Sequence, residues 1–204
     1  MHFVALKTME SRRFEAIVVR TYVSGEDDLV LHVISKEFGK LSLIAKHSRK
    51  SRKRYGSPID LLDHGRFQMR NTNGSLGLLQ SYEPAGQFKA LRQNLDRLTT
   101  ASLVCEAFDL LVHETQTDAA DIFEVLQLGL RAINDADTTK AALKACHVCI
   151  ASLLRVTGNL DDADCLTPTA NNLRKLFSYI ESHSERRLVS AGAVMGMVQG
   201  LARS

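Results

Sequence analysis

The spacing of apolar residues changes once along this chain of 204 residues, and that change constrains the fold most strongly. Between residues 14 and 81 apolar and polar residues largely alternate, which is the pattern of strands with one buried face. After Pro84 apolar residues recur every three or four positions, the pattern of amphipathic helices. Strands followed by helices predict an α+β chain of two domains, residues 1–82 and 83–204.

Five segments of the first part alternate as strands do, and Gly, Asn and Ser residues separate them. They are Ala16–Val23, Asp28–Ser35, Lys40–Lys46, Leu61–Arg70 and Leu76–Ser81. Their order favours an antiparallel meander. Five short strands are sufficient to close a small barrel, and the OB-fold is a barrel with that strand count. We therefore expect an N-terminal five-stranded OB-fold β-barrel, followed by an α-helical bundle domain.

The second part holds five helical segments, which begin near residues 88, 118, 138, 167 and 188. The first has an interruption near Gln93. The second is acid-rich at its start, as the helix dipole favours, and the third ends at Gly158, which suits a left-handed residue after a helix.

Composition narrows the class of protein. Hydrophobic residues make up 45% of the chain and charged residues 24%, so most of it should bury ordinary cores. No run of eighteen apolar residues and no signal-peptide pattern is present, and four cysteines are too few for a disulfide scaffold. We expect a soluble, reduced protein of the cytoplasm without membrane contact.

The positive charge is concentrated in one segment. Residues 1–80 hold 14 Lys and Arg against 8 Asp and Glu, whereas the rest holds 12 against 15. Six of the nine residues from position 46 to 54 are basic and none is acidic: Lys46, Arg49, Lys50, Arg52, Lys53 and Arg54. This run falls between the third and fourth predicted strands. It is either a solvated loop, a targeting-type cluster, or a contact surface for a polyanion.

We favour nucleic-acid binding, because a polyanion would relieve the repulsion among these like charges. The contacts would be mostly to phosphates, because no ordered recognition element aims these side chains at bases. Arg20, Lys40 and Arg66 on neighbouring strands extend the patch if they face outward. Single-strand binders also need rings on which bases stack, and Tyr55 is the first candidate, with Tyr22 and Phe67 nearby.

The sequence carries no catalytic or metal-binding motif of a known kind. It lacks H-E-x-x-H, G-x-S-x-G and the phosphate-binding loop G-x-x-x-x-G-K-[ST], so we expect no enzyme and no cofactor. Cys146 and Cys149 form one CxxC pair to which Cys165 could add a ligand, but the pair lies mid-helix. Buried helical cysteines are the better interpretation. The acidic residues Asp161, Asp162 and Asp164 fit a solvated loop better than a cation site.

The segment Gly25–Lys50 resembles the bacterial recombination mediator family RecO. That family has an early A-x-V-L strand, an acidic motif before an apolar strand, a turn with an acidic residue and glycine, and a strand ending A-K-G-A-R. The counterparts here are Ala16–Val19, Glu26 with Asp28, Glu37 with Gly39, and Ala45-Lys46 with Arg49. Further on, Pro58–Leu62, Leu91–Leu98, and Leu154 to Gly158 followed by Cys165 resemble later family segments.

The resemblance implies an OB-fold, a helical domain and no ATP hydrolysis. It also implies binding of single- and double-stranded DNA and annealing of complementary strands. The implied protein partners are RecR and single-stranded DNA-binding protein, with RecA loading as the outcome, and RecF and RecA as further partners.

Three departures from the family pattern affect these expectations. His47 replaces the glycine after Ala-Lys, which should alter the turn. The second CxxC pair of the family's zinc-binding insertion is missing, so we expect no zinc. The C-terminus is short for the family, and Met9 is a plausible alternative start.

Two alternatives remain open. One is an adaptor that works through protein contacts of the helical domain, receiving an acidic peptide tail in an apolar groove with a basic rim. Its candidate rim residues are Lys140, Lys144, Arg155, Arg174 and Lys175. The other is an RNA-binding OB module.

Overall fold

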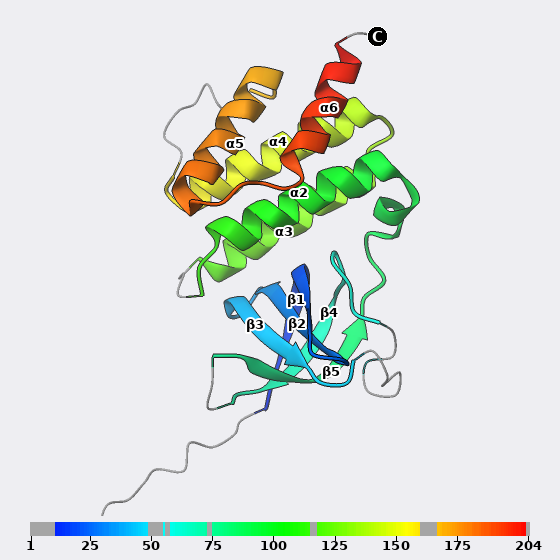
Figure 1. The fold of residues 1–204 in the computed structure, drawn as a ribbon, viewed down its shortest axis with the longest axis vertical. Coiled ribbons are helices and arrows are strands. Elements are labelled where there is room, and N and C mark those ends of the chain that lie inside the picture. The colour runs from blue at the N-terminus through cyan, green and yellow to red at the C-terminus, as the bar shows by residue number, and fades with distance from the viewer. Residues whose placement is uncertain are drawn as a thin grey trace, which may run out of the picture.

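The computed structural model describes residues 11–48, 55, 58–72, 75–114, 118–159 and 167–202. Figure 1 shows a β-barrel at one end of the molecule and a stack of helices at the other. The chain builds the barrel first and then the helices, as the change of apolar spacing predicts.

The barrel consists of β1 (Ser11–Ser24), β2 (Asp28–Ser35), β3 (Gly39–Ala45), β4 (His64–Arg70) and β5 (Gly77–Pro84). It is closed, in the order β1-β2-β3-β5-β4. The expected five-stranded barrel is confirmed, but the simple meander is wrong. Strand β5 inserts between β3 and β4 and pairs with β3 in parallel, at Leu43 with Gly77 and Ile44 with Leu78.

Strand β1 is longer than its alternating segment because it serves two neighbours. Its first half pairs with β4 and its second half with β2, and its register with β2 shifts between Val18 and Arg20. Such an irregularity bends a strand and helps a small sheet to close. The barrel interior is apolar, and the rings of Phe14, Phe67 and Tyr82 lie next to one another within it.

The helical part begins with a 3-10 turn, η1 (Lys89–Gln93), and continues with five helices among the residues that the structure describes. These are α2 (Leu95–Leu111), α3 (Ala119–Asn134), α4 (Thr139–Val156), α5 (Ala170–Ser184) and α6 (Ala191–Leu201). The break expected near Gln93 is confirmed, and the Asn94 side chain there accepts a hydrogen bond from the Arg97 amide to cap α2. Gly158 follows α4 with a positive φ of 71°.

Helices α3 and α4 pack closely because Gly129 has no side chain. A Cβ at that position would lie 2.2 Å from Cys149 Sγ. Cys105, Cys146 and Cys149 are buried and free, so burial of the helical cysteines is confirmed. Burial raises the pKa of the Cys146 thiol to about 12. Cys165 lies outside the described residues.

One apolar core joins the two parts of the molecule. Ile17, Val19, Ile34 and Leu62 belong to the barrel segment, yet they pack into the core of the helices rather than into the barrel interior. Helices α2 and α3 accordingly lie against β1, β2 and β3 (Figure 1). None of the helices that the structure describes is long and apolar enough to cross a membrane.

Candidate nucleic-acid interface

The basic run leaves the barrel at the end of β3. Lys46 and His47 follow Ala45 directly and are both exposed. His47 has a positive φ of 55°, a conformation that glycine adopts without strain and that histidine visits more readily than most residues. Its amide donates a hydrogen bond of 2.9 Å to Asp28 Oδ1. His47, which stands where the resembled pattern has glycine, therefore takes a glycine-like conformation, held in place by Asp28.

The run returns to the barrel at Tyr55. This ring is 1% exposed and packs in the barrel interior, so the expectation that it offers a stacking surface is wrong. Its hydroxyl lies 3.3 Å from the carbonyl oxygens of Lys46 and Leu79 and donates to them. Tyr55 thus ties the far end of the basic run to its beginning and to β5. Between them, Arg49, Lys50, Arg52, Lys53 and Arg54 lie outside the described residues, and their role stays a prediction.

Three cationic or ionisable side chains from neighbouring strands converge on Asp109 of α2. Arg20 Nη1 lies 3.0 Å from Asp109 Oδ2, while His32 Nδ1 and Lys40 Nζ lie 2.6 Å and 3.0 Å from Oδ1. The Lys40 ammonium also donates to the Asp109 main-chain carbonyl. These residues come from β1, β2 and β3, and all three point outward from the barrel toward the helices.

The Asp109 carboxylate is only 2% exposed. Burial by itself would raise its pKa, but hydrogen bonds from His32, Lys40 and Arg20 and the charge of Lys40 hold the pKa well below the ordinary value. Asp109 therefore stays ionised.

This cluster corrects the expected patch. Lys40 is 12% exposed and its ammonium is occupied by α2, so it does not extend a solvent-facing basic surface. Arg20 keeps a third of its side chain exposed and contributes partly.

Of the three candidate stacking rings, Tyr22 is the one that solvent can partly reach. Phe67 is 1% exposed inside the barrel, whereas Tyr22 is half-buried on the outer face of β1. The Arg20 guanidinium carbon lies 4.7 Å from the centroid of the Tyr22 ring, and the His32 ring packs edge-on at 5.1 Å. The two contacts fix the orientation of Tyr22 beside a cation, an arrangement that suits base stacking.

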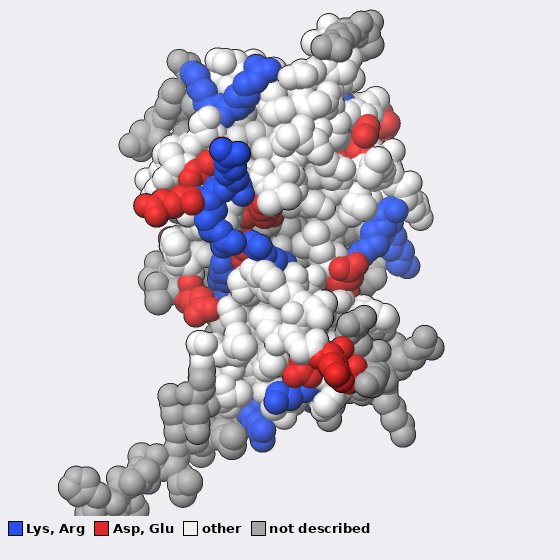
Figure 2. All heavy atoms as spheres, viewed as in Figure 1, with Lys and Arg blue, Asp and Glu red and all other residues white. Residues whose placement is uncertain are grey.

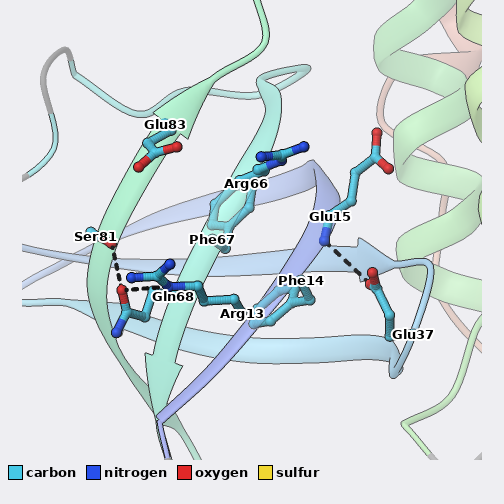
Figure 3. Close-up of a pocket in the computed structure, with 9 residues that line it drawn as sticks. All are labelled: Arg13, Phe14, Glu15, Glu37, Arg66, Phe67, Gln68, Ser81 and Glu83. Carbon is cyan, nitrogen blue, oxygen red and sulfur yellow. Dashed lines mark hydrogen bonds between the residues drawn. The ribbon is translucent and has the colours of Figure 1, made fainter.

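Arg66 lies on a different face of the barrel. Figure 3 shows it on β4 at a cavity of about 360 Å³ that is shared with Arg13. Arg66 pairs in register with Glu15 on one side and Glu83 on the other, and Glu37 completes the lining. Three carboxylates against two guanidinium groups make this a mixed surface. The structure does not bring Arg66 together with Arg20 and Lys40.

A family model matches the barrel part of the chain. The family model described as "Recombination protein O N terminal" matches residues 9–88, which include all five strands. Many curated proteins match as well, among them DNA repair proteins RecO from several bacteria. Its barrel is similar to the N-terminal part of RecO proteins.

Among its RecO relatives, the DNA repair protein RecO of Syntrophus aciditrophicus is 27% identical over 161 residues. That alignment covers 78% of this chain and 61% of the relative. The DNA repair protein RecO of Bacillus cytotoxicus is 31% identical over 61% of this chain and 49% of its own length. That of Listeria monocytogenes is 31% identical over 59% and 47%. The chain thus spans between 47% and 61% of the length of these RecO proteins.

Asp109 is the main site residue that the sequence analysis missed. The signal was present, because Asp109 is an acidic residue within the apolar stretch of α2. A charge on such a face needs a partner, but the partners lie 69 to 89 residues away and cannot be named from the pattern. Among the described residues, no group of three or more His, Cys, Asp or Glu is arranged to hold a metal ion.

Proposed function

We propose that this chain binds DNA through its barrel and acts in DNA repair and recombination as a strand-annealing mediator. The support is the match of residues 9–88 to the RecO N-terminal family together with the closed OB-like barrel. The named relatives are DNA repair proteins. In this proposal the protein helps to load RecA on single strands that are coated by single-stranded DNA-binding protein, with RecR as a partner and RecF as a further one.

The observation that carries the proposal is how the chain leaves and rejoins the barrel on either side of the basic run. It starts at exposed Lys46 and ends at Tyr55, whose hydroxyl holds both ends against the barrel. Ordering a loop at its two ends reduces the entropy lost when a ligand binds. Its cations would then neutralise phosphates and reduce the repulsion between two strands held on one protein.

The salt dependence of binding tests this arrangement. If about four to six phosphates are contacted, log K against log salt should slope by roughly −3 to −4 on single strands. Replacing Arg49, Lys50, Arg52, Lys53 and Arg54 with Ala should flatten the slope and weaken all sequences alike. The matched control replaces five exposed cations of the helices, namely Arg131, Lys144, Arg155, Arg174 and Lys175. An unchanged slope in the first variant would place the DNA surface elsewhere.

Strand annealing is the activity to measure. We expect the protein to anneal complementary oligonucleotides, both bare and coated with single-stranded DNA-binding protein. Absence of annealing under both conditions would defeat the proposal. Competition between matched RNA and DNA oligonucleotides separates it from an RNA-binding OB module.

An adaptor role is the second candidate, because the helical part carries an apolar groove. A cavity of about 520 Å³ lies between α4, α5 and α6, lined by apolar residues such as Leu143, Leu173 and Val198. Lys140 and Lys144 stand at it, whereas Arg155, Arg174 and Lys175 do not line it. An acidic peptide with an apolar end fits this combination of charge and shape. Lys140→Glu with Lys144→Glu should abolish binding of such a peptide to the full chain and leave binding of single-stranded DNA intact.

A further inference from the structure

The connection between α5 and α6 is a fixed turn, and it lies along α2 (Figure 1). Glu185 ends α5 in the left-handed conformation with φ 54°, and Leu188 is buried beneath the turn. The Leu188 amide donates a 2.9 Å hydrogen bond to Glu181 Oε1. The next two amides, of Val189 and Ser190, both donate to the Glu106 carboxylate of α2, at 2.6 Å and 3.0 Å. Two carboxylates therefore hold three consecutive amides.

This turn presents two arginines to solvent. Arg186 and Arg187 are exposed, and within the described part of the chain no hydrogen bond or ion pair holds either guanidinium group. The other arginine in the vicinity, Arg20, is bound by Asp109. Two unpaired charges on a well-anchored turn repel each other at some cost, which an anionic ligand would relieve.

The turn lies beside the outer face of β1. A cavity of about 250 Å³ is lined by Val19, Arg20 and Thr21 of β1 and by Val189 and Ser190 of the connection. Arg186 is near enough to act on Tyr22. Burial and the Asp109 charge raise the pKa of Tyr22, while the charges of Arg20 and Arg186 lower it. Figure 2 shows Lys and Arg side chains gathered where the helices meet the barrel, with acidic side chains at the border of the group.

We propose that Arg186 and Arg187, with Arg20 and Tyr22, form a second contact surface for single-stranded DNA. We call these four residues the waist surface. It combines three guanidinium groups with one partly exposed ring, the pairing of phosphate and base contacts that single-strand binders use. A strand held by the basic run would continue across β1 onto the helical part, so that both parts of the molecule contact one strand. This inference rests on the DNA binding proposed above.

The test compares Arg186→Ala/Arg187→Ala with Arg174→Ala/Lys175→Ala, which removes the same charge from exposed positions on α5. The affinity for oligothymidine of about thirty nucleotides is measured over a range of salt concentrations. The same measurement is made with oligothymidine of about ten nucleotides, which is closer to the length that one OB-fold binds. Loss of two phosphate contacts should flatten the slope for the longer strand by about 1.4 and weaken binding tenfold or more near 0.1 M salt. The control should keep the wild-type slope, and the shorter strand should be less affected.

Tyr22 supplies a second measurement. Tyr22→Ala should weaken binding roughly fivefold or more, whereas Tyr22→Phe keeps the stacking ring and should bind as wild type does. Thermal melting of each variant shows whether the fold is retained.

The outcomes separate this inference from the proposal on which it rests. If the wild type binds no single strand, the proposed function fails. If the basic-run variant loses affinity while Arg186→Ala/Arg187→Ala matches its control, only the waist surface is refuted.

Discussion

Asp109→Asn tests how the barrel is held to the helices. The change keeps the size of the side chain and removes its charge from a site that is 2% exposed. It leaves the cations of Lys40 and Arg20 facing a neutral amide, with side-chain exposures of 12% and 33%. We expect a large loss of stability because these groups are only partly able to reach water.

The magnitude follows from the burial of the partners. Removing one member of a buried ion pair costs about 3–5 kcal/mol. Arg20 and His32 keep part of their contact with water, which screens the pair, so the lower end applies and we expect a loss of about 3 kcal/mol in the free energy of unfolding. For a chain of this length that corresponds to a fall in Tm of about 6–12 °C.

The pH dependence gives an independent check with a definite sign. The pKa of Asp109 is lower in the folded protein than in the unfolded chain, so its contribution is fully present above the ordinary carboxyl pKa of about 4. It is lost as the pH falls below that value toward the lowered pKa. The stability difference between wild type and Asp109→Asn should therefore shrink as the pH is lowered from about 5 to about 2.

Urea denaturation followed by circular dichroism measures both effects. The control is Glu124→Gln, which removes one charge from an exposed position on α3 and should change stability by less than about 0.5 kcal/mol. The reasoning is refuted if Asp109→Asn is as stable as the control near neutral pH, or if its deficit is unchanged in acid.

Three further changes test other parts of the structure. Tyr55→Phe removes the hydroxyl that joins the ends of the basic run, and should cost about 1 kcal/mol in urea denaturation. It should also weaken binding of single-stranded DNA, and unchanged affinity would argue against the anchoring role. His47→Gly should raise the free energy of unfolding by up to about 1 kcal/mol, and the Tm with it, because glycine adopts the φ of 55° without strain. A clear loss of stability would contradict that conformation. Gly129→Ala should lower the free energy of unfolding by about 1–3 kcal/mol, because the added methyl group meets Cys149. In the double variant Gly129→Ala/Cys149→Ala part of that loss should be recovered. Additive effects of the two substitutions would contradict the close approach of α3 and α4.

The elements themselves could be predicted from local patterns. The bounds of β2 agree with the expected segment, and the break before α2 falls one residue from Gln93. These features depend on alternation, on helical spacing and on a capping residue, all of which are local. The position of β5 between β3 and β4 was missed because the parallel pairing at Leu43 and Ile44 joins residues more than thirty positions apart.

The candidate site was predictable only where it depends on local sequence. The run of charge at residues 46–54 is visible in the sequence, but the fate of its neighbours depends on distant groups. Lys40 is bound by a residue 69 positions further along the chain, and Tyr55 is buried because the barrel interior accepts its ring. The role proposed for Arg186 depends on the approach of its turn to β1, which no local pattern indicates.

The shared core has a consequence for engineering. Because Ile17, Val19 and Ile34 are covered by helices, a fragment that ends after Pro84 would expose an apolar face on the outside of its barrel. Such a fragment should self-associate. A chimera that exchanges barrels between relatives would likewise have to carry α2 and α3 with the strands. The smallest portable unit of this protein is therefore the barrel together with the two helices that cover it.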